Sequence, residues 1–139
     1  MNPTGEFAEG ACHCGTVRFR VRLLDGFNTI RRCNCSYCRM RGAVAVSARA
    51  GDLEVIAGSE ALTLYRFNTG VAEHHFCSKC GISTHHRRRS DPSLLGVNVA
   101  CLAGVSPFDF PDVPVVDGVH HPKDTGALRV VGRLRFTAV

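Results

Sequence analysis

The sequence predicts a mainly β fold of antiparallel sheets, and two observations lead to this prediction. Apolar and polar residues alternate with a period of two along several segments, whereas the periodicity of amphipathic helices is sparse. Turn-forming residues such as glycine, aspartate and asparagine separate these segments. A length of 139 residues suits one ordinary domain, so we expect residues 1–139 to form a single domain.

The expected strands follow from this alternation. In segment 17–23, four apolar residues share one face and arginines occupy the other, which predicts a half-buried strand with a solvated face. Segment 128–136 repeats this design, with Leu128, Val130, Leu134 and Phe136 alternating with arginines. Further strands are expected at 43–48, 53–57, 61–67 and 94–102, with turns at Gly51-Asp52, Gly58-Ser59 and Asn68-Thr69-Gly70. A short helical turn can follow Cys38.

Segment 106–125 differs in composition, because it holds four prolines and several aspartates. We expect an ordered loop or extended excursion here rather than a regular element. Loops of this length in small domains are often functional, so its part 117–122 could fold over a metal site. A plain wrap over the surface is an equally good interpretation.

The charge and the N-terminus narrow the class of protein. Seventeen Lys and Arg against 12 Asp and Glu give a formal charge of +5, which suits an anionic small molecule at least as well as nucleic acid. The absence of Trp and the presence of only two Tyr argue against nucleic-acid stacking. The first seven residues show no basic start followed by an apolar stretch, and no apolar run is long enough to span a bilayer. We therefore expect a soluble, cytoplasmic protein without a membrane partner.

The eight cysteines are the main candidates for functional residues. They fall into a CxC motif (Cys12, Cys14), a CxCxxC motif (Cys33, Cys35, Cys38), a CxxC motif (Cys77, Cys80) and a single Cys101. A reducing compartment argues against disulfides. The CxxC motif of Cys77 and Cys80 is followed by an expected strand rather than the helix that a redox motif needs. Cys101 lies in an apolar alternating run, where a buried, inert thiol is expected.

The spacing divides the other seven cysteines between two metal ions. The CxC and CxxC motifs each end in a glycine, Gly15 or Gly81, that can turn the chain back toward the sulfurs. We expect Cys12, Cys14, Cys77 and Cys80 to enclose a structural zinc ion. Cys33, Cys35 and Cys38 would leave a second zinc with one open position, which is the pattern of catalytic zinc. A histidine in that position would instead make both ions structural.

Three ordered clusters resemble those of the glutathione-dependent formaldehyde-activating enzymes, which are small zinc proteins. They are Gly10-Ala-Cys-His-Cys-Gly-Thr-Val-Arg-Phe19, Cys33-Asn-Cys-Ser-Tyr-Cys-Arg39 with Gly42-Ala43, and Phe76-Cys-Ser-Lys-Cys-Gly-Ile82. The resemblance implies a β-tent fold related to the B-type methionine sulfoxide reductases, and the same two zinc sites. It also implies a carbon–sulfur lyase like S-(hydroxymethyl)glutathione synthase. The expected partners are a thiol such as glutathione and a small aldehyde such as formaldehyde, with a homodimer left open.

The coordination chemistry favours one mechanism for such a reaction. Three thiolates on a divalent zinc leave a local charge of minus one, so the ion is a weak Lewis acid and poor at making hydroxide. A zinc-bound substrate thiolate can still attack a carbonyl carbon. We expect Arg39, with part of the run Arg87-Arg88-Arg89, to hold a substrate carboxylate, and His75 and His120 to carry the proton.

Two other functions remain open from the residues. A non-catalytic zinc module could bind a protein or nucleic-acid partner through its basic strands. Methionine sulfoxide reduction would need a nucleophilic cysteine near the C-terminal strands, and the apolar setting of Cys101 argues against a reactive thiolate there.

Overall fold

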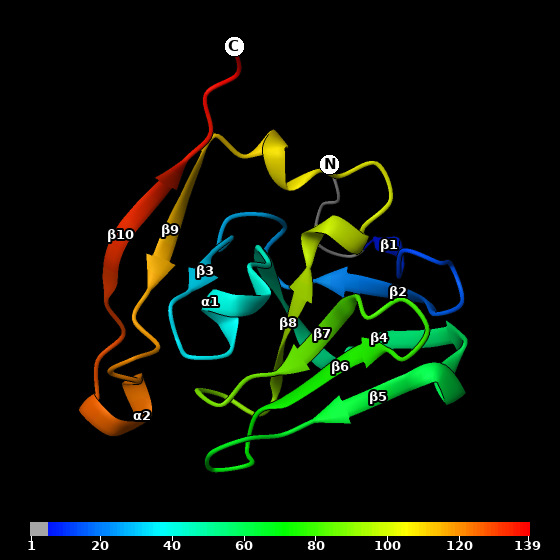
Figure 1. Ribbon diagram of the computed structural model, residues 1–139, viewed down its shortest axis with the longest axis horizontal. Helices are drawn as coiled ribbons and strands as arrows, with labels where there is room; N and C mark the ends of the chain where they lie inside the picture. Colours follow the sequence, from blue (N-terminus) through cyan, green and yellow to red (C-terminus); the bar gives the residue numbers. More distant parts are fainter. Residues whose placement is uncertain (1–5) are drawn as a thin grey trace.

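The computed structural model describes residues 6–139 and contains two β-sheets (Figure 1). Most of the N-terminal segment inspected for an export signal lies outside the described residues. Nearly all strand pairs are antiparallel, and the helices are single turns. The prediction of a mainly β, antiparallel fold is therefore confirmed, while the relation to B-type methionine sulfoxide reductases stays a prediction. Within residues 6–139, no helix is long and apolar enough to cross a membrane.

The larger sheet has seven strands in the order β1-β2-β4-β8-β7-β6-β5, and all neighbours in it run antiparallel. Its strands, in chain order, are β1 (Phe7–Ala11), β2 (Arg18–Leu23), β4 (Ala45–Ala57), β5 (Leu62–Tyr65), β6 (Glu73–Cys77), β7 (Ser83–Arg87) and β8 (Leu94–Asn98). After β7 the chain returns to the centre of the sheet, where β8 lies between β4 and β7.

The smaller sheet has three strands in the order β10-β9-β3. They are β3 (Arg32–Cys33), β9 (Asp112–Val116) and β10 (Val130–Arg135), and β3 runs parallel to β9. The helices are α1 (Cys38–Arg41) and α2 (Pro122–Thr125), with 3₁₀ turns η1 (Ser59–Ala61), η2 (Val99–Cys101) and η3 (Pro107–Asp109). In Figure 1 the small sheet stands beside the large one, and α1 lies between them.

The main core forms on one face of β2 and its neighbours. Phe19 and Val21 are fully buried in β2, as the alternation predicted, while Arg20 points outward and pairs with Glu54. Gly10 on β1 lies under the ring of Phe19, and a Cβ there would overlap the ring. The other members of this core are Leu23, Val44, Val46, Ala48, Val97, Val99, Cys101, Leu102 and Val113. This core fixes the sheet on which the functional side chains stand.

Two of the expected boundaries are wrong. Gly51-Asp52 is not a turn between two strands, because β4 runs on from Ala45 to Ala57. Its residues 45–49 pair with β8, and its pairing with β2 contains a register shift between Val21↔Leu53 and Leu23↔Ala48 that accommodates the residues in between. Segment 106–125 is not without regular structure, since β9 lies within it and pairs with β10.

The expectation of a half-buried strand at 128–136 is also wrong. β10 is an edge strand with only β9 beside it, and each of its residues is exposed. Its apolar residues therefore do not enter the core, although their alternation is the same as in β2. Periodicity identified the strand but could not show what covers it.

Candidate functional site

Four cysteines that are far apart in the sequence lie in one group. Cys12 and Cys14 follow β1, Cys77 ends β6, and Cys80 follows it. The Sγ atoms of Cys12, Cys14, Cys77 and Cys80 all lie within 4.8 Å of one another. Cys12 and Cys14 sulfurs are 3.7 Å apart, and those of Cys14 and Cys77 are 3.8 Å apart. These separations are those of thiolates sharing a tetrahedral ion with bonds of about 2.3 Å, and they exclude a disulfide of about 2.05 Å.

Backbone geometry prepares these sulfurs for a cation. Gly15 and Gly81 both adopt a left-handed φ of 79°, and their amides donate to the carbonyls of Cys12 and Cys77. The amides of Val17 and Lys79 point at the sulfurs of Cys12 and Cys77, at 3.3 and 3.4 Å. Amide hydrogens directed at sulfur stabilise thiolates, so the group could hold a metal ion.

A second group unites Cys33, Cys35 and Cys38, whose sulfurs also lie within 4.8 Å of one another. Cys33 ends β3 and Cys38 begins α1, so a short turn supplies all three. The amide of Cys35 donates to the Cys33 sulfur at 3.4 Å, and the amide of Cys38 donates to the Cys35 sulfur at 3.3 Å. The structure thus brings the seven cysteines together as four and three.

The three sulfurs resist simultaneous ionisation. Hydrogen bonds from the thiols of Cys33 and Cys38 lower the pKa of Cys35 to about 2. The hydrogen bonds from Cys33 to Cys35, and from Cys38 to Cys33 and Cys35, raise the pKa of the two donors, since a thiol that ionises loses the bond it donates, and burial raises it further. Three thiolates can coexist here only beside a cation, which is what a metal ion would provide.

A cavity of about 430 Å³ opens on this group. All three cysteines line it, together with side chains from α1, from both sheets and from the segment that follows β9. The volume lies in the range of small-molecule sites, which is roughly 300–1,000 Å³. The four-sulfur group does not line this cavity, so the two groups differ in access as well as in ligand number.

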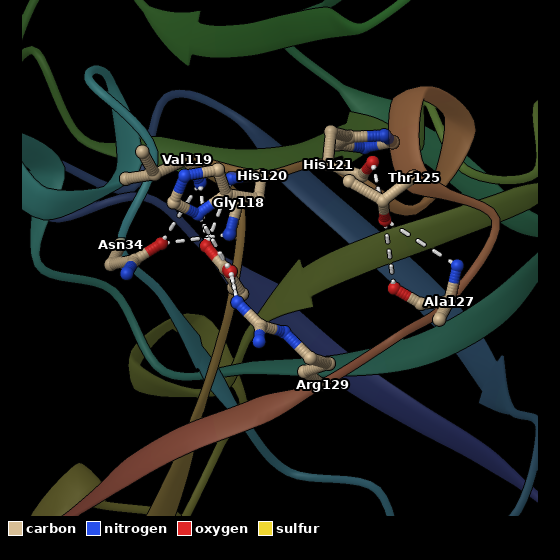
Figure 2. Close-up of polar contacts among 9 residues, drawn as sticks. Asn34, Gly118, Val119, His120, His121, Thr125, Ala127 and Arg129 are labelled. Carbon is tan, nitrogen blue, oxygen red and sulfur yellow. Dashed lines mark hydrogen bonds and ion pairs between the residues drawn. The ribbon is translucent and has the colours of Figure 1, made fainter.

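The segment after β9 closes one side of the cavity against the three-sulfur group. The Asn34 side chain accepts hydrogen bonds from the amides of Gly118 and Val119, at 2.7 and 3.2 Å (Figure 2). Asp117 is buried and accepts hydrogen bonds from His120 and Arg129. These bonds, first that from the His120 amide, hold the pKa of Asp117 well below its usual range. The carboxylate therefore stays ionised and anchors the segment.

Replacing Gly118 with alanine is expected to weaken metal binding at the three-sulfur group. An added Cβ would overlap the sulfur of Cys33 and lie 2.8 Å from Cys35 Cβ, so the segment or the sulfurs must move. Displaced supporting contacts typically reduce metal affinity about 10- to 100-fold. Competition with a chelator measures the effect. Gly132→Ala is the matched control, because nothing lies within 4 Å of its added Cβ; equal affinities for the two variants would contradict this expectation.

The paired histidines divide between the two faces of the large sheet. His74 and His86 line the cavity and stack at 5.1 Å, whereas His75 and His85 stack at 4.5 Å and are not among its lining residues. His86 lies over Gly96, where a Cβ would overlap its ring. Burial, with the nearby Arg41 charge, lowers the pKa of His74 to about 4 and that of His86 well below its usual value. Both imidazoles are therefore neutral near pH 7.

The structure places the two histidines predicted as proton carriers away from the cavity lining. His75 is directed to the other face, near Glu73, and the His120 side chain is 66% exposed beside Asp117. His121 lines the cavity instead. Its Nδ1 accepts the amide hydrogen of Lys123 at 3.1 Å, so the neutral ring carries its proton on Nε2. Sequence alternation could not tell which member of each pair faces inward.

His85 is expected to make the protein less stable as the pH falls. Burial lowers its pKa from 6.5 to about 3, so the unfolded chain binds a proton that the folded chain does not. The stabilisation is present above pH 6.5 and is lost as pH falls toward 3, by up to about 1.4 kcal/mol per pH unit. His85→Gln removes the group that binds this proton. The free energy of unfolding of the variant should therefore fall less steeply between pH 6.5 and 5 than that of the unsubstituted chain. Parallel curves in denaturant titrations would show that His85 does not titrate this way.

The arginines predicted to bind substrate separate in the same way. Arg39 on α1 is exposed and lines the cavity. Arg87 faces away and binds the Val71 carbonyl and Glu73, and Arg89 forms an ion pair with Asp124 at 2.7 Å. Arg88 faces the cavity, as does Arg31, which the sequence gave no reason to select. Arg41 donates to the Cys38 sulfur at 3.3 Å, and its place one helical turn after Cys38 could have indicated this contact.

Cys101 lies in the core apart from both sulfur groups. Burial raises the pKa of its thiol to about 12, so it has almost no thiolate at neutral pH. This agrees with the expected inert role and removes the nucleophile that sulfoxide reduction would need.

Comparisons with known proteins identify similar sequences and a similar solved structure. A family model described as glutathione-dependent formaldehyde-activating enzyme matches residues 7–112. A curated Halomonas elongata protein, named putative glutathione-dependent formaldehyde-activating enzyme, is 40% identical over 81 residues, which cover 52% of this chain and 50% of that protein. The chain thus spans about half the length of this relative. The crystal structure of a Rhodobacter sphaeroides structural-genomics target matches with a TM-score of 0.76 and 57% identity, over 77% of this chain and 98% of that one.

Proposed function

Since the chain belongs to the family of glutathione-dependent formaldehyde-activating enzymes, we propose that it is a carbon–sulfur lyase that joins a thiol to a small aldehyde. The expected substrates are glutathione and formaldehyde, which the name of the Halomonas relative also mentions. In this reaction the thiolate sulfur bonds to the carbonyl carbon, the C=O π bond opens, and the oxygen takes a proton. The product is S-(hydroxymethyl)glutathione, and the reverse reaction cleaves the same carbon–sulfur bond.

The single observation that carries the proposal is the contrast between the two sulfur groups. Four sulfurs complete a tetrahedral site, whereas three leave one position on a group that lines a cavity of about 430 Å³. We propose zinc at both, because all-thiolate tetrahedral sites favour it. A zinc ion at the three-sulfur group would supply a position at which a substrate thiol can bind as thiolate. Such sites need reduced cysteines, which supports a reducing, cytoplasmic setting.

The chain's own residues then bind substrate and handle the proton. Arg41 donates to Cys38 and balances part of the thiolate charge. His121 holds a proton on Nε2 and lines the cavity, so it can donate a hydrogen bond to the oxygen that becomes negative. Arg39 at the rim remains the proposed contact for a substrate carboxylate. His75 and His120 remain predictions from the sequence, and the lining of the cavity favours His121 over both.

The test combines metal content, thiol binding and exchange kinetics. Purified protein is expected to hold two zinc ions, and X-ray absorption at the zinc edge should show an added sulfur ligand when glutathione is supplied. Exchange NMR with ¹³C-formaldehyde should show faster interconversion of free and thiol-bound aldehyde than the uncatalysed mixture gives. Two tightly held zinc ions with no added sulfur would contradict the proposal and favour a non-catalytic zinc module.

A further inference from the structure

Arg31 and Arg88 meet at one buried hydroxyl on the cavity wall. Arg31 Nη1 donates to Ser47 Oγ at 3.0 Å, and Arg88 Nη1 donates to the same oxygen at 3.2 Å. Ser47 lies in β4 and is only 2% exposed, while both arginines are among the residues that line the cavity. Arg31 bridges β4 at Ala45, and Arg88 follows β7, so different parts of the fold bring the two together.

This pair of cations lacks an acidic partner. Among residues 6–139, neither arginine takes part in an ion pair within 4.0 Å. The aspartates whose charges act on them have other partners, since Asp91 accepts hydrogen bonds from Ser93 and Asp25 accepts one from Thr29. Arg31 Nη2 is buried and has no hydrogen-bond partner. Two like charges held at one neutral oxygen repel each other, and an anion that joins them relieves the repulsion.

Several other charged side chains of the cavity already have partners. Arg89 is paired with Asp124, and Asp117 is satisfied by Arg129 and His120. Arg41 is directed at Cys38 and at the rings of His74 and His86. Apart from the exposed Arg39 at the rim and from Arg41, the positive charge of the cavity without an acidic partner is therefore concentrated at Arg31 and Arg88.

We propose that Arg31 and Arg88, with Ser47 between them, form a carboxylate subsite on the cavity wall that selects thiols carrying a carboxylate. A carboxylate offers two oxygens in the plane of a guanidinium fork, so it can bridge the pair. Arg31 immediately precedes β3, which carries Cys33, so one small molecule can reach both the subsite and the three sulfurs. The inference rests on the proposed function in taking the thiol as the bearer of the carboxylate.

The test compares two thiols that differ in one carboxylate. N-acetylcysteine and N-acetylcysteine amide are titrated calorimetrically into the zinc-loaded full chain. We expect the acid to bind about tenfold more tightly, as for a charge-assisted hydrogen-bonded pair. Arg88→Gln should abolish this preference, and Arg49→Gln, which removes one charge from an exposed site outside the cavity, should keep it. Equal affinity for the two thiols, or an undiminished preference in Arg88→Gln, would overturn the subsite while leaving thiol binding intact.

Two further measurements keep the inference separate from the function and from folding. N-acetylalanine carries the carboxylate without a thiol, and NMR should detect its binding to the unsubstituted chain but not to Arg88→Gln. If it binds and no thiol does, the carboxylate site stands and the proposed function fails. Arg88→Gln removes one of two repelling cations, so its melting temperature without ligand should equal or exceed that of the unsubstituted chain. A clear loss of stability would mean that the pair has a structural role, and would contradict the subsite.

Discussion

Replacing Cys77 with serine is expected to unfold the protein. Cys77 is fully buried at the end of β6, in a core that is smaller than the main one and contains only Cys12, Val17 and Ala61 as its other buried members. A structural zinc site contributes roughly 10–16 kcal/mol in small peptides, whereas whole domains are stable by about 5–15 kcal/mol. Loss of one thiolate should therefore remove the cooperative thermal transition seen by circular dichroism.

Cys101→Ser is the matched control for this result. Cys101 is equally a buried cysteine, but it lies outside both sulfur groups and already donates to the Ser83 carbonyl, a contact that a serine hydroxyl can make. This variant should keep both metal ions and melt within a few degrees of the unsubstituted chain. A Cys77→Ser protein that retains a four-ligand ion and a similar melting temperature would show that the fold does not depend on this site.

The cysteine groups could be predicted from the sequence because their motifs determine local geometry. A CxC or CxxC motif closed by Gly15 or Gly81 places two sulfurs together whatever the rest of the fold does. The strand at 17–23 was also predictable, since its apolar face had to enter a core. By contrast, β9 was not predicted, because Pro114 argues against a strand. Pro114 fits in β9 because the pairs of β9 with β3 begin one residue later, at Val115.

Which side chains face the cavity could not be predicted, because this depends on the position of the small sheet relative to the large one. Alternation shows that His74 and His75 point to opposite sides, but the position of β9 decides which side is the site. Likewise, the sequence offered Arg88 only as one of three neighbouring arginines and did not single out Arg31, and only the structure shows that both reach Ser47 on β4. The family match ends at residue 112, so the segment with Gly118 and His121 lies beyond it.

Replacing Cys35 with serine should have the opposite consequence to Cys77→Ser: the ion of the three-sulfur group is lost while the fold is retained. Serine can accept the Cys38 amide as Cys35 does, so the turn into α1 keeps its local contacts. Its hydroxyl does not ionise near neutral pH, however, and two remaining thiolates bind zinc far more weakly than three. Metal analysis should then find one ion per chain, and exchange between glutathione and formaldehyde should return to the uncatalysed rate.

The melting temperatures of the two variants decide whether the sulfurs have separate roles. Because the three-sulfur group lies on a cavity rather than in the core, Cys35→Ser should lower the melting temperature by only a few degrees. If Cys35→Ser and Cys77→Ser lower it equally, the division into an enclosed and an open site is wrong. If Cys35→Ser keeps its fold, loses its ion and still accelerates the exchange, the chemistry lies elsewhere in the molecule, and the three-sulfur group is not the place where the thiol binds.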